Sequence, residues 1–403
     1  MISIKNTLFF FSSVLISSSC IKQEKIQKIN YTLPYKFNYE IEDKLAKDSL
    51  PWKFQIAASD YASKGNYKDA LRTWDSVFPM RERIYTSTEI DSIKTSFTPV
   101  NAIDFITSEA TKTQITIINE AHHSSLHRNF TKQLLQKLYN NGYKHLGLEA
   151  LSNGNEKDTE LNTRKYPIQT TGYYTKDPQF GDLIREALAI GFHIFPYEQS
   201  TDKNGKEREI AQAKNIQQVI NKFPNEKILI HCGFDHALEG IHSSWEKALA
   251  ERLKEYTNID PLTINQVLYS EKSNPKFNHP LLKVFNINEP TILINKKDGK
   301  PMPYIKKDSW SDIAVLHPNT NFVNDKANWL NNQIPINLNN YQLTYPVMVL
   351  AYLKNEDIST AIPVDIVELK DKNSACFLNL KKGEYNIVIT NIKDSFLLHK
   401  EVK

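Results

Sequence analysis

Short runs of β-branched and apolar residues alternate with longer amphipathic segments between about residues 100 and 272, and this alternation constrains the fold more than any other feature of the chain. Repeated alternation of strand and helix is typical of a mostly parallel sheet flanked by helices. We therefore expect an α/β domain at 100–272, with strands at 113–120, 144–150, 192–198 and 226–233 and helices at 127–142, 179–191, 208–223 and 243–256.

The segments on either side of this domain have different patterns. Residues 46–99 contain spacings like those of one tetratricopeptide unit, with Gly65 at the turn, and predict a helical hairpin that caps the main domain, because a single unit cannot stack on itself. Residues 273–403 alternate apolar and polar residues between turns such as Lys-Asp-Gly, which predicts a C-terminal β-rich module. Residues 21–45 are charged and lack a hydrophobic period, so we expect a tether there.

The first twenty residues resemble a lipoprotein signal peptide. Lys5 precedes the apolar run 8–16, and three serines then lead into Cys20, the expected lipidation site. The apolar run is too short to cross a membrane, and an ordinary secretory signal is the alternative. Cleavage before Cys20 would leave an extracytoplasmic, membrane-anchored lipoprotein, in the periplasm or on an outer-membrane leaflet. The two remaining cysteines, Cys232 and Cys376, suggest no disulfide framework.

The charge pattern argues against nucleic acid as a partner. The formal net charge is only +4, and the 50 Lys and Arg residues are interspersed with 46 Asp and Glu residues. Binding to a phosphate backbone requires a concentrated basic surface.

Ionisable residues lie at or just after the ends of all four expected strands of the α/β domain. Parallel strands end at one edge of their sheet, where ligands bind in such folds. We therefore expect one site built from the residues that follow these strand ends, namely Glu120, His122 and His123, then Glu149, then Glu198, and finally Asp235 and His236.

This set of side chains suits a reaction that activates water. An imidazole beside a carboxylate is a general base near neutral pH, and Glu120, His122 and His236 would also suit a divalent metal ion with an open position for water. Arg208 would orient an anionic substrate group or pair with Glu198. The chain has no G-x-S-x-G or G-x-G-x-x-G motif, so covalent serine catalysis and a phosphate-binding loop are poorly supported.

Other histidines and tryptophans have less specific interpretations. We expect His123 to cap the next helix or face solvent if it is not part of the site, His127 to lie on a helix surface, and His231 to be a hydrogen-bonded core residue. The group His317, Trp310 and Trp329 is expected in an aromatic core or domain seam, with ligand contact as the alternative.

The motifs Asn119-Glu-Ala-His122, His127, LGLEA and CGFDHALEG together resemble the superfamily that joins erythromycin esterases, Tiki-type metalloproteases and ChaN-like haem-binding lipoproteins. The resemblance covers about residues 100 to 270 and is closest to the ChaN-like pattern, although Asn119 stands where glycine is usual. The segment KEREIAQAKNI is similar to an Arg-containing helix start in these relatives. The resemblance implies catalytic roles for Glu120, His122, Glu149 and His236.

Two functions remain open on the sequence alone. The first is a Glu/His-assisted or metal-assisted hydrolase acting on an ester or amide bond in a small molecule or peptide. The second is a haem-binding or iron-uptake lipoprotein, in which haem would be held noncovalently because no Cys-x-x-Cys-His motif exists.

Overall fold

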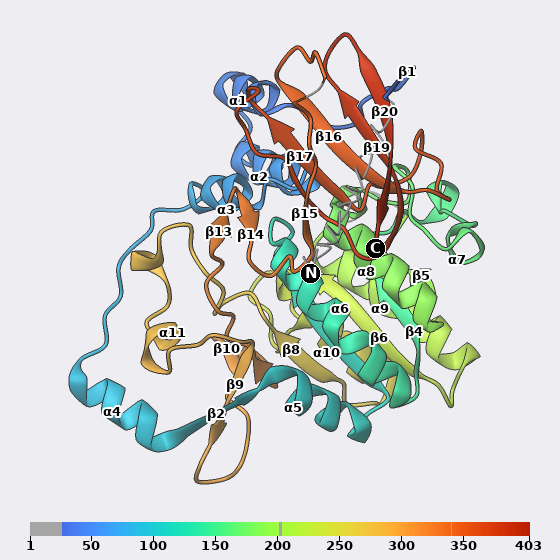
Figure 1. Ribbon diagram of the computed structural model, residues 1–403. Coiled ribbons are helices and arrows are strands. Elements are labelled where there is room, and N and C mark those ends of the chain that lie inside the picture. Colours follow the sequence, from blue (N-terminus) through green and yellow to red (C-terminus); the bar gives the residue numbers. More distant parts are fainter. Residues whose placement is uncertain (1–25, 201–203, 340) are drawn as a thin grey trace, which may run out of the picture.

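The computed structural model describes residues 26–200, 204–339 and 341–403 (Figure 1). The expected signal peptide and Cys20 lie outside the described residues. No helix within the described ranges is both long and apolar enough to cross a membrane.

The centre of the fold is a six-stranded sheet in the order β12-β8-β3-β6-β4-β5, in which every pair of neighbours is parallel. The four expected strands are confirmed as β3, β4, β5 and β6. The strand bounds are β3 (Ile115–Glu120), β4 (Tyr143–Leu148), β5 (His193–Pro196), β6 (Lys227–Gly233), β8 (Leu262–Asn265) and β12 (Ile313–Ala314).

Helices cover both faces of this sheet. One core packs α6 (Ser125–Asn140) and α8 (Pro178–Ile190) against residues such as Ile118 and Leu229. The other packs α9 (Lys206–Lys222) and α10 (Leu249–Thr257) against residues such as Ile117 and Ile230. Because the chain leaves β3 toward one face and β6 toward the other, the carboxyl ends of these adjacent strands form a topological switch point, where α/β folds have their crevice.

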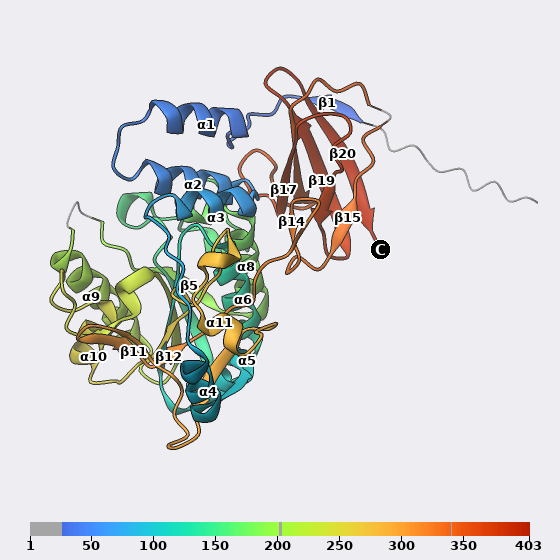
Figure 2. The ribbon, with the colours of Figure 1, turned by 90° about the vertical axis from the view of Figure 1, so that its left-hand side faces the viewer.

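The expected helical hairpin is confirmed as α2 (Lys53–Ser63) and α3 (Tyr67–Asp75), and α1 (Asn38–Lys47) packs beside them. Figure 2 shows these helices over one end of the α/β body, beside the C-terminal sheet. Gly65, at the turn, has φ +77°, and a Cβ there would lie 2.7 Å from the carbonyl oxygen of Ile366. Glycine therefore allows the hairpin to approach the C-terminal sheet closely.

The C-terminal β-rich region consists of a sheet in the order β1-β20-β19-β16-β17 and several short strand pairs. The sheet strands are β1 (Gln27–Ile29), β16 (Val347–Leu353), β17 (Asp365–Leu369), β19 (Gly383–Thr390) and β20 (Ser395–Val402), and the two-residue and three-residue strands paired nearby are β13 (Phe322–Val323), β14 (Lys326–Ala327), β15 (Gln333–Pro335) and β18 (Phe377–Asn379).

Two expected segments of the chain need correction. The expected tether at 21–45 is wrong for its described part, because β1 pairs with β20 and α1 begins at Asn38. Residues 291–314, expected in the C-terminal module, instead belong to the α/β body: β9 (Thr291–Asn295) pairs with β2 (Phe97–Asn101), and β12 pairs with β8. The placement of both segments depends on backbone pairing between strands that are far apart in the chain. The local hydrophobic pattern contains no information about such pairing.

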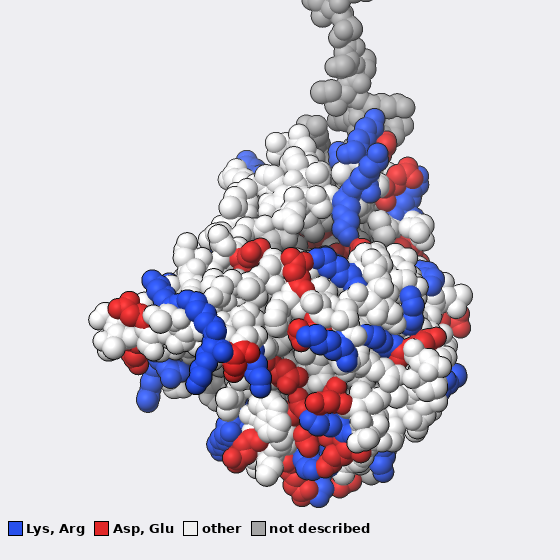
Figure 3. All heavy atoms as spheres, turned by 90° about the horizontal axis from the view of Figure 1, so that it is seen from below, with Lys and Arg blue, Asp and Glu red and all other residues white. Residues whose placement is uncertain are grey.

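The remaining elements surround the α/β body. They are α4 (Ser87–Ser96), α5 (Ala102–Glu109), α7 (Leu161–Arg164), α11 (Leu281–Val284), β7 (Glu239–Gly240), β10 (Tyr304–Lys306) and β11 (Ser309–Ser311). Figure 3 shows one face of the molecule, on which Lys and Arg are interspersed with Asp and Glu and form no continuous basic surface.

Candidate active site

The site lies at the carboxyl ends of three neighbouring strands. Glu120 is the last residue of β3, Glu149 follows β4, and Gly233 is the last residue of β6, directly before the turn that contains His236. The parallel register places Glu120 opposite Gly233. Residues far apart in the chain therefore meet at one edge of the sheet, as the strand pattern predicts.

A buried ion pair holds Glu120. Its Oε2 accepts a hydrogen bond from Nε of Arg128 at 2.7 Å, and its Oε1 accepts one from Nη2 at 2.8 Å. Nη1 of Arg128 donates to Oδ2 of Asp177 at 2.6 Å. All three side chains are at most 2% exposed. Burial raises the pKa of Glu120, but the Arg128 guanidinium and the bond to His122 outweigh burial and hold the pKa well below its ordinary range.

The carboxylate of Glu120 orients His122. Nδ1 of His122 lies 3.0 Å from Oε1 of Glu120, so the ionised carboxylate accepts a hydrogen bond from Nδ1–H. The ring stacks on Tyr174 with 3.9 Å between ring centroids and meets Phe234 edge to face. This arrangement leaves Nε2 as the acceptor nitrogen of the neutral ring.

Gly233 makes room for His122. A Cβ at this position would lie 2.6 Å from Nε2 of His122 and 3.3 Å from Oε2 of Glu149. The main-chain N–H of Gly233 also donates a hydrogen bond to Glu149. The glycine is therefore required by space, and His122 and Glu149 both lie against it.

Arg208, at the start of α9, connects the other side chains of the site. Its Nη2 donates to Oε1 of Glu149 at 2.6 Å, its Nε lies 3.1 Å from both oxygens of Glu198, and its Nη1 lies 3.0 Å from Nε2 of His236. The expected pairing of Arg208 with Glu198 is thus confirmed. The side chain of Arg208 is 26% exposed, so part of it contacts solvent.

The carboxylate of Glu209, on α9, orients His236. Nδ1 lies 2.8 Å from Oε2 of Glu209, which also accepts the N–H of Leu249 at 2.8 Å. Nε2 lies 3.4 Å from Oε1 of Glu149, and the ring stacks on Trp245. Burial lowers the pKa of His236, but Glu149 and Glu209 outweigh burial and raise this pKa above its ordinary value.

The electrostatic environment of Glu149 differs from that of an isolated buried carboxyl. Burial raises its pKa, but His236, His122, Arg208 and the N–H of Gly233 together lower the pKa to about 2. Glu149 is therefore an anion at neutral pH, between the two histidines.

The expected metal ligands Glu120, His122 and His236 do not fit a metal ion as the structure places them. Both oxygens of Glu120 are bound by Arg128 and lie against Nδ1 of His122, and Nε2 of His236 faces the Arg208 guanidinium. Among the described residues, no group of three or more His, Cys, Asp or Glu side chains is arranged to hold a metal ion.

Two expected residues lie apart from this constellation. Asp235 is held by His242 and Lys306 at the protein surface. His123 neither caps α6 nor faces solvent, because it is 7% exposed and stacks on Trp74 with 4.2 Å between ring centroids.

The expectation that His127 lies on a helix surface is wrong. It is fully buried, its Nδ1 accepts the N–H of Ala121 at 3.0 Å, and its Nε2 donates to Oγ of Ser270 at 2.6 Å. His231 is a core residue as expected, although its Nε2 has no hydrogen-bond partner within the described residues and lies 3.6 Å from Glu120. Burial lowers the pKa of His231 to about 4.

Sequence reasoning also missed side chains that hold the site together. Arg128 and Asp177 are buried and charged, Glu209 is the partner of His236, and Tyr174 covers His122. One signal was present for Glu209, because it directly follows Arg208 in the segment that carries the family resemblance. The direction of the Arg128 side chain has no sequence signal.

The group His317, Trp310 and Trp329 does not form one cluster. His317 is fully buried and bonds to Gln266, Trp329 stacks near Tyr67 at the seam with α3, and Trp310 is 40% exposed on β11. The expectation of core and seam positions is confirmed for His317 and Trp329.

Comparisons with known proteins do not identify a family for this chain. No family model and no curated protein matches the chain. Similar solved structures include the type III effector HopBA1 (13% identity, 45% of this chain and 94% of that chain, TM-score 0.33) and RRSP, a MARTX toxin effector domain from Vibrio vulnificus (18% identity, 51% and 43%, TM-score 0.28). A structure of bacterial protein toxins is also similar (18% identity, 55% and 46%, TM-score 0.34). At these TM-scores the similarities carry no conclusion about this chain.

The lowered pKa of Glu149 predicts how stability depends on pH. Because this pKa is about 2 in the folded protein and 4.5 ordinarily, ionised Glu149 contributes stability that is fully present above pH 4.5 and is lost as the pH falls toward 2. We expect Glu149→Gln to reduce the fall in melting temperature between about pH 6 and pH 3. Glu289→Gln, an exposed control, should keep the wild-type pH dependence. An unchanged slope in Glu149→Gln would contradict the assigned environment.

Proposed function

We propose that the chain is a hydrolase that uses its Glu and His side chains to cleave an ester or amide bond in a small molecule or peptide. The observation that carries this proposal is the pairing of each histidine with its own buried carboxylate, His122 with Glu120 and His236 with Glu209, on either side of Glu149. Two imidazoles in different environments suit the two proton transfers of hydrolysis.

His122 is the proposed general base. Glu120 holds the proton on Nδ1, so the lone pair of Nε2 is free to take a proton from water. The side chain of His122 is 18% exposed, which gives water access to it. Arg128 keeps Glu120 ionised, so Glu120 stabilises the imidazolium that forms.

His236 and Arg208 supply the other two functions that hydrolysis needs, protonation of the leaving group and stabilisation of the oxyanion. In the structure, Nε2 of His236 accepts a hydrogen bond from Nη1 of Arg208, because a guanidinium only donates. When Arg208 turns to the substrate, the raised pKa of His236 favours protonation of Nε2, which then gives this proton to the leaving group. The Arg208 guanidinium, next to His236, stabilises the negative charge that develops on the carbonyl oxygen. Glu149 orients Arg208 and maintains the charge of His236.

These steps need no metal ion, and the site residues are already bound to guanidinium groups where a metal ligand set was expected. We further propose membership in the erythromycin esterase, Tiki and ChaN-like superfamily, on the motifs that contribute Glu120, His122, Glu149 and His236. An extracytoplasmic lipoprotein anchored through Cys20 fits the sequence pattern of the first twenty residues. Nothing in the geometry favours the alternative, haem binding.

His122 provides the direct test of the proposal. The full chain is assayed against a panel of chromogenic esters and peptide anilides, and we expect His122→Ala to lower kcat/KM by about 10²- to 10⁴-fold, the usual contribution of a general base. His399→Ala, at an exposed position on β20, should keep the wild-type rate, and circular dichroism checks that both variants fold. The proposal is wrong if no ester or amide on the panel is cleaved, or if His122→Ala retains full activity.

The role of His236 as an acid predicts a pH profile. A protonated His236 is required, so the rate should fall as the pH rises through its raised pKa. Glu209→Gln removes one of the carboxylates that raise this pKa, so the alkaline fall should move to lower pH. Glu207→Gln, two positions before Glu209 on the exposed side of the same helix turn, is the matched control. An alkaline limb that does not move in Glu209→Gln would assign the acid to another group.

A further inference from the structure

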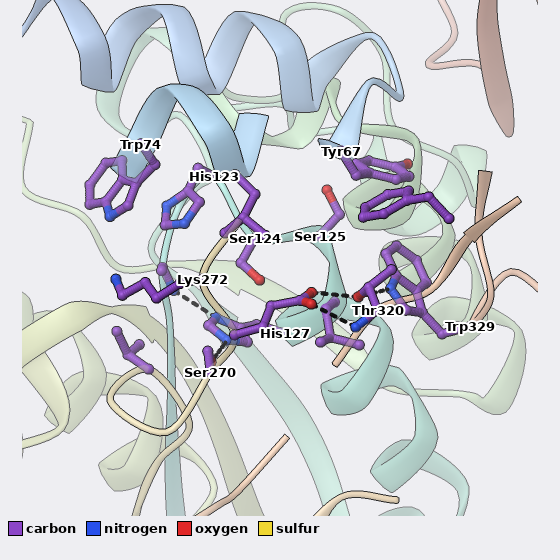
Figure 4. Close-up of a pocket in the computed structure, with 16 residues that line it drawn as sticks. Tyr67, Trp74, His123, Ser124, Ser125, His127, Ser270, Lys272, Thr320 and Trp329 are labelled. Carbon is purple, nitrogen blue, oxygen red and sulfur yellow. Dashed lines mark hydrogen bonds between the residues drawn. The ribbon is translucent and has the colours of Figure 1, made fainter. Parts of the chain in front are cut away.

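A pocket lies beside the β3–α6 loop, which also carries His122 of the Glu149 site. Its wall is formed by four parts of the chain that are distant in sequence: helix α3, the loop that contains His123, the segment around Lys272 and the segment around Thr320. Figure 4 shows Trp74 and His123 on one side, Tyr67 and Trp329 on the other, and Ser124 and Ser125 between them. The hydrolytic steps above do not use this pocket.

Aromatic rings dominate the pocket wall. Tyr67, Trp74, Phe322 and Trp329 all line it, and the rings of Tyr67 and Trp329 lie 5.2 Å apart at 36°. One face of Trp74 is covered by His123. Trp74 also stacks with Phe234 at 5.5 Å between ring centroids. The π-system of an aromatic ring attracts an organic cation that lies over its face, so a wall with several rings suits such a ligand.

A carboxylate without a cation partner lies in the same wall. Glu271 accepts hydrogen bonds from the N–H of Thr320 at 2.6 Å and from its hydroxyl. In the described chain, no Lys, Arg or His forms an ion pair with Glu271, because the neighbouring Lys272 ammonium pairs with Asp75 at 3.4 Å. With Glu271 ionised, Glu271, Lys272 and Asp75 together contribute a net charge of −1. Burial raises the pKa of Glu271, which is the cost of this uncompensated charge.

The His123 ring adds an unused hydrogen-bonding atom. His123 is 7% exposed, lines the pocket, and its Nδ1 has no hydrogen-bond partner within the described residues. Burial holds the pKa of His123 well below its ordinary value, so the ring is neutral and does not repel a cation. The ring therefore offers one hydrogen-bonding nitrogen that a ligand in the pocket could use.

We propose that this pocket binds an organic cation, an alkylammonium group, between the aromatic rings and the carboxylate of Glu271. The rings supply cation–π attraction to the methyl or methylene groups, and Glu271 supplies the opposite charge. An anionic ligand is disfavoured by the net charge, and an uncharged apolar group would leave Glu271 without compensation.

The site stands independently of hydrolysis, but its position connects the two. The pocket is lined by Ala121 and His123, the neighbours of His122 in the chain. If the proposed hydrolysis also holds, the substrate is an ester or amide that carries an alkylammonium group on the side of the scissile bond facing α3.

Calorimetric titration of the full chain with choline tests the site, with 3,3-dimethylbutan-1-ol as the uncharged isostere. We expect saturable binding of choline that is at least about ten-fold tighter than binding of the alcohol, since the two ligands differ only in charge. Glu271→Gln should weaken choline binding by about ten-fold and leave the alcohol unaffected. Glu289→Gln, which removes an exposed carboxylate outside the pocket, is the control.

Two further variants distinguish a cation site from a pocket that binds any apolar group. Phe322→Leu keeps the wall apolar but removes a ring, so choline should bind more weakly while the alcohol binds as before. Lys272→Met should bind choline at least as tightly as the wild type, because it removes a positive charge from the wall. Equal affinity for choline and the alcohol, no binding of choline, or weaker choline binding in Lys272→Met overturns the proposal. Because binding is measured without turnover, Glu149→Gln should retain it whether or not the chain is a hydrolase.

Discussion

The buried guanidinium of Arg128 connects the fold to the site. It binds Glu120 with two hydrogen bonds and Asp177 with a third, and all three side chains are almost fully removed from water. Buried charges are tolerated only when they are paired and hydrogen-bonded, and removing one partner of such a pair is strongly destabilising. Asp177 also caps α8 through the N–H of Gln179 and accepts hydrogen bonds from Ser125 and Tyr67. A single network therefore holds the sheet, two helices and the helical hairpin in register with the candidate base.

Both histidines of the site are held by a carboxylate at Nδ1, but the charges around the two rings differ. Each imidazole has a carboxylate behind Nδ1, and each carboxylate comes from a different kind of element: Glu120 from a strand end, Glu209 from the first turn of a helix. Around His122, the charge of Glu120 is already balanced by Arg128. Around His236, two carboxylates act on one ring and raise its pKa. In the proposed mechanism, this difference in surroundings assigns the acid role to His236 and the base role to His122.

Much of the framework was accessible from the sequence. The four strands, the alternating helices and the hairpin were predicted, because hydrophobic period and Gly65 report local structure. Residues Glu120, His122, Glu149 and His236 were expected together, and they meet at one sheet edge. The predictions failed where long-range pairing decides: β1 joins the C-terminal sheet instead of forming a tether, β12 extends the central sheet, and His127 is buried against Ser270 instead of facing solvent.

What the sequence by itself determined is which side chains reach the edge of the sheet, because strand ends follow from the alternation of apolar runs and all parallel strands point the same way. Only the tertiary structure decided which side chain each of these site residues contacts. Arg128 on α6 and Glu209 on α9 approach the site from helices whose rotation and crossing are set by packing against the sheet. The same holds for the pocket at Glu271, whose walls come from segments about 250 residues apart. Spacing along the chain carries no information about these directions, because they depend on how whole layers pack.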